Sequence, residues 1–552
     1  MATDTIMGTC PPREGELHAM PLQGGIGNLR ERWFLTVVCF VSFTLMVIRL
    51  LQGLIPASDS IFGHMTEGGL WSELPKADFY EKYAGGLSVL HTGIFRVFGV
   101  NLLAPRLVLL VFFMAWVPSF WYVARRITSA IGASVISLLA VTWSVPLYPS
   151  PLPFWYNLYF ATFGTAALLR YLNSRRARWL FLAGLMGGLS SLVKMSGLYF
   201  LAAACVFLIF DEQSVQDTVR YRERTVQDSV LSVIVTLVLV GFDILTLRLI
   251  EANPDHLTGL YHFVAPATAL SFLLMVREWR EPRFASSVRM WQLAGRLLPL
   301  LMGALLPVVL FLPYAYSGDI KSWFAGSLVL PPTAFPPAFQ LAAHPISAIC
   351  CVPLFLVLVL NSKLQRTWSR RVALAVLSGA LFCLLLAILR HPLIGLWAWV
   401  SVGTIIPLIT LVGVFVLLHG SVKGIDAARL VLLLSVTAVC SLVELPTSGP
   451  LHFCFVAPLA ILALAELART TASGSRISLL TPFAVFYAAL LLVMIMPSWV
   501  ANSGLSQRSA PQVGRDRMTT TQLWNPRNTA EFCCPEAPPE HLHVVIRVML
   551  HM

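Results

Sequence analysis

Residues 107–124 read LVLLVFFMAWVPSFWYVA, a run without a charged side chain, and Arg125 and Arg126 follow it directly. An α-helix needs roughly 20 apolar residues to cross about 30 Å of hydrocarbon. Lipid offers the backbone no hydrogen-bond partners, so a spanning segment has to be a helix or a strand of a closed barrel. The run lacks the alternation of apolar and polar residues that a barrel strand shows, so it predicts a transmembrane helix.

Similar apolar runs recur along the whole chain. The first begins at Trp33 and continues past residue 50, which is too long for the core of a signal peptide, so we expect an uncleaved first helix. Further runs lie near 129–148, 156–172, 179–195, 197–210, 229–250, 259–276, 297–316, 345–361, 372–389, 396–418, 428–445, 453–468 and 478–496. The sequence therefore predicts an all-α, polytopic transmembrane helical bundle of about 13–15 helices.

The composition supports a membrane solvent rather than water. Of the 552 residues, 57% are hydrophobic and 12% are charged, whereas a soluble chain carries roughly 25% charged residues. The formal net charge of +12 could indicate nucleic-acid binding, but the charges fall in the loops, so no nucleic-acid partner is expected. The ten cysteines show no C-x-x-C or Cys/His metal spacing, and we interpret those within apolar runs as small buried hydrophobes.

The positions of the basic residues predict the topology, because short loops rich in Lys and Arg stay in the cytoplasm. The basic segments all fall on one side of the predicted helices, and they are 30–32, 125–126, 175–178, 220–224, 277–296, 363–371 and 469–476. We therefore predict a cytoplasmic N-terminal tail at 1–32, a transmembrane domain at 33–496 and a polar external C-terminal tail at 497–552.

Two predicted external loops, 57–105 and 317–344, are longer than is needed to connect neighbouring helices of a bundle. Function is expected there, since loops carry binding and catalytic residues more often than the elements they connect. The first contains an apolar stretch that predicts short amphipathic helices. The second contains Pro331-Pro332 and Pro336-Pro337, which suit either a lid over a ligand or a stiff connection.

Within the first external loop, Asp59 is followed by Asp78-Phe79-Tyr80, then by Phe98-Gly99 and Arg106. This order resembles the first external loop of the GT-C superfamily of lipid-dependent glycosyltransferases, which includes protein O-mannosyltransferases and the lipid A aminoarabinose transferase. Many members carry Asp-Glu at the first position, where this chain has Asp59-Ser60, and that departure weakens what the resemblance implies about the acceptor side.

Two later segments add to the resemblance. One opens with Trp155-Tyr156-Asn157 and ends at Lys194-Met195-Ser196-Gly197, and the other is 448–452 together with Pro458, similar to the start of a late helix in bacterial members. The glycines Gly184, Gly187 and Gly188 lie inside an apolar run with no preceding strand, so close helix packing explains them better than nucleotide binding.

The resemblance implies a GT-C-like fold and an inverting transfer of a sugar from a dolichyl- or undecaprenyl-phosphate type of donor to a lipid, glycan or protein acceptor. It also implies a site on the external face of the inner or plasma membrane of a bacterium, as part of cell-envelope chemistry. Nucleotide sugars are made in the cytosol, so a donor used at that face should already be linked to a lipid. Many members have a folded domain after the last helix, so we expect a C-terminal region that is reduced or truncated.

Transfer to a hydroxyl needs a base for the acceptor proton and positive charge for the departing phosphate. Asp59 is the predicted base; the alternative is a solvated loop carboxylate. Asp78 is predicted to position the acceptor or, with Asp59, a divalent cation, which is the one cofactor considered; the alternative is a helix cap.

The predicted donor-phosphate ligands are Arg106 and Lys194 at external helix ends, with Lys82 as a weaker candidate. The alternative for Arg106 and Lys194 is that they extend to lipid headgroups. His452 and Tyr80 are predicted sugar or acceptor contacts, although His452, like Glu444, could equally be a water-exposed helix end. The competing functions are a transporter or flippase for lipid-linked sugars and a non-catalytic membrane subunit that handles them.

Overall fold

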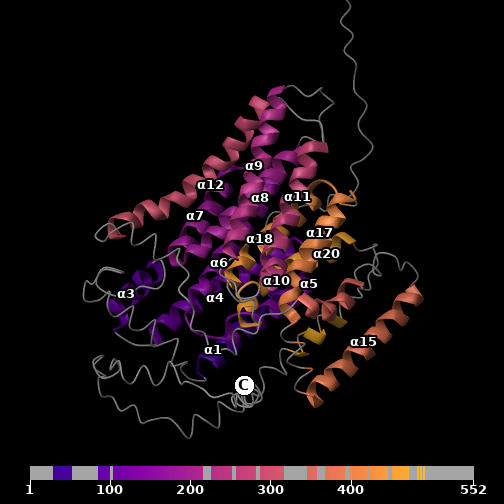
Figure 1. The fold of residues 1–552 in the computed structure, drawn as a ribbon. Coiled ribbons are helices and arrows are strands. Elements are labelled where there is room, and N and C mark those ends of the chain that lie inside the picture. Colours follow the sequence, from indigo (N-terminus) through magenta and orange to yellow (C-terminus); the bar gives the residue numbers. More distant parts are fainter. Residues whose placement is uncertain are drawn as a thin grey trace, which may run out of the picture.

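The computed structural model describes residues 29–51, 85–99, 103–215, 226–250, 256–280, 286–315, 345–356, 367–391, 401–420, 422–445 and 450–471, with isolated residues at 394, 398 and between 482 and 490. The regular structure of these residues is helical (Figure 1). The α-helices are α1 (Leu29–Leu51), α3 (Gly86–Phe98), α4 (Leu103–Arg125), α5 (Ala130–Thr142), α6 (Pro153–Ser174), α7 (Ala177–Val193), α8 (Leu198–Val215), α9 (Val226–Leu249), α10 (His256–Gly259), α11 (Ala265–Arg280), α12 (Ser286–Ala315), α15 (Thr367–Arg390), α17 (Ile405–Leu418), α18 (Gly424–Cys440), α19 (Pro450–Cys454) and α20 (Ala457–Thr471).

Short non-α helical turns extend several of these helices. The 3-10 helices are η1 (Val145–Leu147), η2 (Met195–Gly197), η6 (Pro345–Cys351), η7 (Val402–Thr404) and η8 (Ser441–Glu444), and η4 (Leu260–Val264) is a π-helix that joins α10 to α11. The helices coincide with the apolar runs of the sequence, which confirms the prediction of an all-α bundle. Most of the predicted run at 478–496 and the whole of the loop 317–344 lie outside the described residues.

Eight of the described helical segments are long and apolar enough to cross a membrane. They are Leu29–Leu50, Leu103–Arg125, Ala130–Leu147, Met195–Ser214, His256–Trp279, Arg289–Phe311, Arg371–Arg390 and Gly424–Glu444. Further apolar helices in the described ranges, such as Ala177–Val193, fall below the length of a full crossing on their own. The chain is an integral, multi-pass membrane protein.

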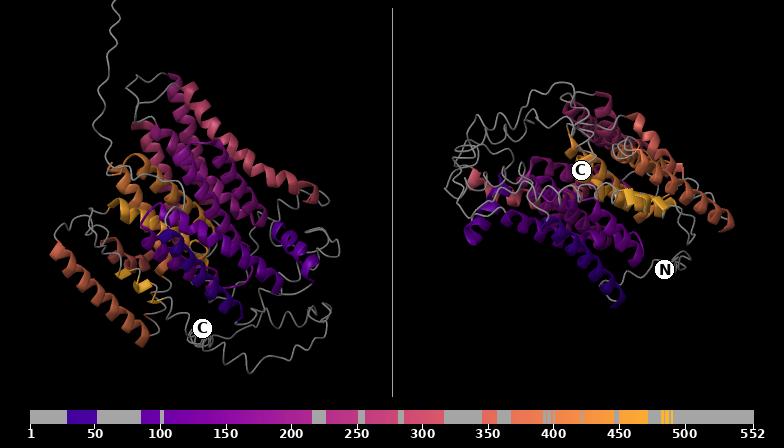
Figure 2. Two further views of the ribbon diagram at one scale, coloured as in Figure 1. Left: turned by 180° about the vertical axis from the view of Figure 1, so that it is seen from behind. Right: turned by 90° about the horizontal axis from the view of Figure 1, so that it is seen from below.

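The segment Gly424–Glu444, which contains α18, lies at the centre of the bundle, because 83% of its most apolar stretch is buried inside the protein. It packs against α8, α20, α17 and α6. By contrast, only 11% of the most apolar stretch of α15 is buried inside the protein. This helix lies at the edge of the molecule in each view (Figures 1 and 2). An apolar helix that is buried on all sides belongs to the protein interior, and one that is exposed on most sides faces lipid.

Glycines allow α7 and α12 to approach closely. A Cβ at Gly184 would collide with the carbonyl of Leu300, and one at Gly188 with the carbonyl of Ala304. From the other side, a Cβ at Gly303 would collide with the carbonyl of Phe181. Small residues at membrane helix interfaces permit such backbone contact. The interpretation of Gly184 and Gly188 as packing residues is confirmed.

One end of the bundle is held together by ion pairs, and we call it the ion-pair end. There Arg125 of α4 contacts Glu31 of α1 at 2.6 Å, and Arg469 of α20 contacts Asp426 of α18 at 2.7 Å. The pairs of Asp211 with Arg175 and Arg296, and those of Arg289 with Glu212 and Glu278, extend the same layer across α6, α8, α11 and α12. Described arginines from four of the predicted basic segments, 125–126, 175–178, 277–296 and 469–476, therefore take part in this layer.

Arg289 is the most completely buried arginine of this layer. It is 2% exposed, and its guanidinium donates to Glu212 of α8 and to Glu278 of α11, whose exposed fractions are 3% and 0%. Gln213 and Ser232 donate further hydrogen bonds to Glu278. The carboxylates are tolerated at this depth because the cation and these donors compensate them.

We expect Arg289→Met to lower the free energy of unfolding by about 3–5 kcal/mol, since it leaves two buried carboxylates without their cation. Unfolding of the detergent-solubilised protein by increasing SDS, followed by circular dichroism, measures the loss. Lys423→Gln, which removes an exposed cation at the start of α18, serves as the control and should change little. Equal stability of the two variants would contradict a structural role for Arg289.

Candidate functional site at the opposite end of the bundle

The end of α7 carries the segment Lys194-Met195-Ser196-Gly197 and lies opposite the ion-pair end. The helix stops at Val193, and Lys194 takes an extended backbone with φ −156° and ψ 138°. The 3-10 turn η2 then folds back so tightly that a Cβ at Gly197 would collide with the backbone of Ser190 and Ser191. The glycine is therefore needed to bring the turn against the last turn of α7, which fixes the position of Lys194.

An aromatic group holds the Lys194 side chain, which is half-buried. Its Nζ lies 3.3 Å from the centroid of the Phe154 ring in the first turn of α6. Phe455 stacks on Phe154 with the ring centroids 4.6 Å apart and the planes at 14°. Because the ammonium and the second ring both lie close over Phe154, they occupy opposite faces of it. A cation in this position is attracted by the ring quadrupole and is held in one place.

His452 belongs to the same group, from the short helix α19. Its ring lies edge-on to Phe154 at 6.5 Å and to Phe455 at 6.1 Å, and it is 5% exposed. Burial, and secondarily the positive charge of Lys194, lower the pKa of His452 from 6.5 to about 4. The imidazole is therefore neutral at physiological pH. The alternative of a water-exposed helix end does not hold for His452.

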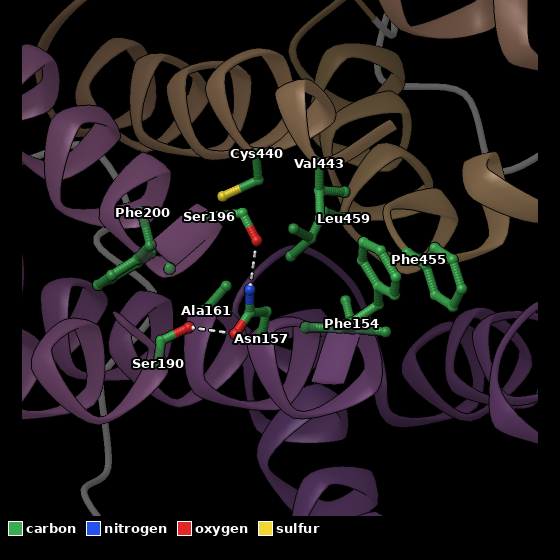
Figure 3. A pocket seen from close by; sticks show the side chains of 12 residues that line it. Phe154, Asn157, Ala161, Ser190, Ser196, Phe200, Cys440, Val443, Phe455 and Leu459 are labelled. Atoms are coloured by element: carbon green, nitrogen blue, oxygen red, sulfur yellow. Dashed lines mark hydrogen bonds between the residues drawn. The ribbon is translucent and has the colours of Figure 1, made fainter. Parts of the chain in front are cut away.

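A row of hydrogen bonds lies beside this aromatic group and crosses from α6 to the end of α7 (Figure 3). Ser190 Oγ donates to Asn157 Oδ1 at 3.0 Å, and Asn157 Nδ2 donates to Ser196 Oγ at 2.7 Å. Asn157 thereby ties the first turns of α6 to both sides of the break at Lys194. In this orientation the amide oxygen of Asn157 accepts one hydrogen bond and the amide nitrogen donates one.

These polar groups line a small pocket. Phe154 and Phe455 form one side of it, and Cys440, the last residue of α18, and Val443 of η8 close it from above in Figure 3. The remaining lining residues are Leu158, Ala161, Gly197, Phe200 and Leu459, together with the hydrogen-bonded row. Mostly apolar walls with a few convergent polar groups are typical of small-molecule sites.

Glu444 also lies at this end of the bundle. The sequence alone suggested a water-exposed helix end for this residue. It closes the 3-10 helix η8 and is 1% exposed, so that interpretation is wrong. Among the described residues, its Oε1 has no hydrogen-bond partner. A buried carboxylate without compensation is costly, and ionisable residues inside a membrane bundle often mark a functional site. Its place within an apolar run was the signal that could have identified it.

Arg106 lies at the same end, in the first turn of α4. It is 1% exposed, and its Nη1 donates to the carbonyl of Leu50 at 3.4 Å, in the last turn of α1. A cation at a helix C-terminus complements the macrodipole. The described contact therefore links the first helix to α4, and the side chain does not extend to the surface as the lipid-headgroup alternative required.

The loop that was predicted to be the first external one contributes α3, which confirms a short amphipathic helix there. Its buried face includes His91 and Phe95, while Val97 and Phe98 are exposed. His91 contacts the hydroxyl of Tyr156 at 3.4 Å, and α3 approaches the end of α7 at Gly86, where a Cβ would come within 2.7 Å of the Leu192 carbonyl. This loop segment is therefore packed against the helix that ends at Lys194.

Four of the predicted site residues lie outside the described residues: Asp59, Asp78, Tyr80 and Lys82. Of the other three, the structure brings Lys194 and His452 together around Phe154, and it places Arg106 at the same end in a separate contact with α1. The described ranges contain no group of three His, Cys, Asp or Glu side chains that could hold a metal ion. The predicted metal ligands Asp59 and Asp78 are not among those ranges.

Solved structures similar to this chain include the oligosaccharyltransferase of Archaeoglobus fulgidus in the apo form, at 12% identity and a TM-score of 0.37. They also include the oligosaccharyltransferase AglB of the same organism in complex with an inhibitory peptide and a dolichol-phosphate, at 10% identity and a TM-score of 0.36. Both alignments cover 95% of this chain and 56% of the other, so the chain spans little more than half the length of those enzymes.

No curated protein matches the chain. Residues 87–242 match a protein family described as dolichyl-phosphate-mannose-protein mannosyltransferase. The matched stretch begins in α3 and ends in α9, and it includes Arg106, Asn157 and Lys194. This match confirms the predicted resemblance of the chain to the GT-C superfamily of membrane glycosyltransferases.

Proposed function

We propose that the protein is an inverting glycosyltransferase that takes a sugar from a polyprenyl-phosphate donor. The acceptor is a protein, a glycan or a lipid at the non-cytoplasmic face of the membrane, in the inner or plasma membrane of a bacterium. The family match over residues 87–242 supports this class of donor. The separation of the bundle into an ion-pair end and a Lys194 end supports the assignment of opposite faces, because basic residues collect on the cytoplasmic side.

One observation carries the proposal: Lys194 is held at a helix break on Phe154, next to His452 and the pocket with Asn157. A phosphate bound to the lysine would receive a charge-assisted hydrogen bond. The neutral His452 and the Asn157 row offer uncharged groups for sugar hydroxyls, which suits a glycan better than a second anion. The apolar pocket wall suits the non-polar faces of a sugar ring.

The remaining roles follow from the sequence. Asp59 would deprotonate the acceptor hydroxyl, which attacks the anomeric carbon from the face opposite the phosphate; the bond to the phosphate breaks, and the phosphate leaves with the electron pair. Asp78 would position the acceptor or a divalent cation, and Tyr80 would contact the sugar or acceptor. Arg106 and Lys82 would add positive charge toward the donor phosphate.

The direct test supplies purified full-length protein in lipid vesicles with a panel of radiolabelled polyprenyl-phosphate sugars and follows release or transfer of the label. We expect turnover of at least one donor. If every donor stays intact but crosses the bilayer, the protein is a flippase; if nothing happens to any donor, the enzyme proposal is wrong.

Lys194→Gln should raise the KM for the donor by roughly 10- to 100-fold, the effect of losing one charge-assisted hydrogen bond worth about 1.5–3 kcal/mol. Lys194→Arg keeps a cation that can stack on Phe154 and should retain more donor affinity than the glutamine variant. Lys423→Gln is the matched control for loss of charge at the ion-pair end. An unchanged donor KM in Lys194→Gln would remove the lysine from the donor site.

Asp59→Asn should lower the rate of transfer by about 10²- to 10⁴-fold with little change in donor affinity, because a general base contributes on that scale. Expression level, membrane insertion and donor binding report whether the variant is folded. Full activity of Asp59→Asn would exclude the aspartate as the base, without affecting the role of Lys194.

A further inference from the structure

Three arginines and two aromatic rings alternate along the ion-pair end of α4, α6 and α7. Arg126 lies over the ring of Tyr122 at 4.9 Å from its centroid, and Arg170 lies over the same ring at 5.5 Å. Arg170 also lies over Trp179 at 5.6 Å, and Arg178 lies over Trp179 at 5.2 Å. We call these five residues the arginine–aromatic cluster. Each ring is shared by two guanidinium groups, so the three cations are neighbours.

The cluster differs from the rest of the ion-pair end in its charge balance. The adjacent residues Arg125 and Arg175 contact Glu31 and Asp211. Within the described part of the chain, no carboxylate contacts the three arginines of the cluster. Arg126 donates instead to the Tyr122 hydroxyl at 3.1 Å. Three positive charges thus share two rings without a described counter-charge, and their mutual repulsion would be relieved by a bound anion.

The helix α7 adds to the positive potential at the same place. Its N-terminus has no side-chain cap, no acidic residue in the first turn and Arg176 at the N-cap position. The positive end of a helix macrodipole favours anions and disfavours cations, yet Arg178 lies in this first turn. Its backbone N–H groups and the guanidinium groups of the cluster therefore favour the same kind of ligand.

The side chains are accessible to such a ligand. Arg170 and Arg178 are exposed, and Tyr122, Arg126 and Trp179 are half-buried. An exposed guanidinium group can donate N–H hydrogen bonds to a phosphate, and the planar fork of arginine suits bidentate binding of phosphate.

We propose that the arginine–aromatic cluster binds the phosphate headgroup of an anionic phospholipid in the leaflet at the ion-pair end. The location favours a lipid, since the cluster includes the last turn of the membrane-spanning helix α4, and Tyr and Trp are enriched where a protein crosses the headgroup region. Basic pockets between transmembrane helices bind anionic headgroups by this chemistry. The site lies at the opposite end of the bundle from Lys194, so it does not depend on the proposed transferase activity.

Native mass spectrometry of the full-length protein tests the proposal, with phosphatidylglycerol and phosphatidylcholine of the same acyl chains as probes. The wild type should retain phosphatidylglycerol in preference to phosphatidylcholine. Arg170→Gln, which removes the central cation, should weaken phosphatidylglycerol binding roughly fivefold, as expected for a contribution of about 1 kcal/mol from one arginine. Binding of phosphatidylcholine should not change.

Lys423→Gln is the matched control, because it removes one exposed cation from the same end without an aromatic partner in the described structure. Equal losses in Arg170→Gln and Lys423→Gln would overturn the proposal in favour of general attraction by the basic end. Displacement of phosphatidylglycerol by millimolar inorganic phosphate would also overturn it, since the site would then prefer free phosphate to a lipid.

Two more variants separate binding from folding. Arg178→Gln removes an exposed member of the cluster and should weaken phosphatidylglycerol binding as Arg170→Gln does, so the test stands even if the latter fails to fold. Arg170→Lys keeps the charge but loses the planar fork, and it should recover only part of the preference. Complete recovery with lysine would contradict the planar fork of arginine as the basis of binding.

Discussion

The cost of placing charge in hydrocarbon is the constraint on which the rest of this structure depends. Long apolar helices force the charged groups to the two ends of the bundle, because lipid can neither hydrate a charge nor satisfy a free backbone group. At the ion-pair end many of the charges are neutralised by ion pairs between helices, such as those of the buried Arg289 with Glu212 and Glu278. These contacts fix which helix ends are neighbours.

The opposite end is organised by different means. Its described polar groups are few, and they are positioned by helix breaks and aromatic rings: Lys194 by the turn at Gly197 and by Phe154, and His452 by the ring pair Phe154–Phe455. The transfer chemistry is therefore proposed at the Lys194 end, where Lys194 and Asn157 lie beside the pocket, and the lipid headgroup site at the ion-pair end, where the arginine–aromatic cluster lies.

Close packing connects the two ends. The glycines of α7 bring it into backbone contact with α12, and the central α18 extends from Asp426 in the ion-pair layer to Cys440 at the pocket. Because α7 begins in the arginine–aromatic cluster and ends at Lys194, its position is determined at one end by cations and at the other by the tight turn. The pocket is therefore built on the rigid part of the bundle, where a site can be held precisely.

The sequence by itself determined the helices, since the length and uniform apolarity of runs such as 107–124 leave one solution in lipid. It also identified Lys194 and His452 as site candidates, through a resemblance. Only the tertiary structure decided that these two meet at Phe154, that Asn157 bridges the break, and that Glu444 is buried. The physical reason is that each of these features joins helices far apart in the chain, and periodicity within one helix carries no information about the neighbour against which it packs.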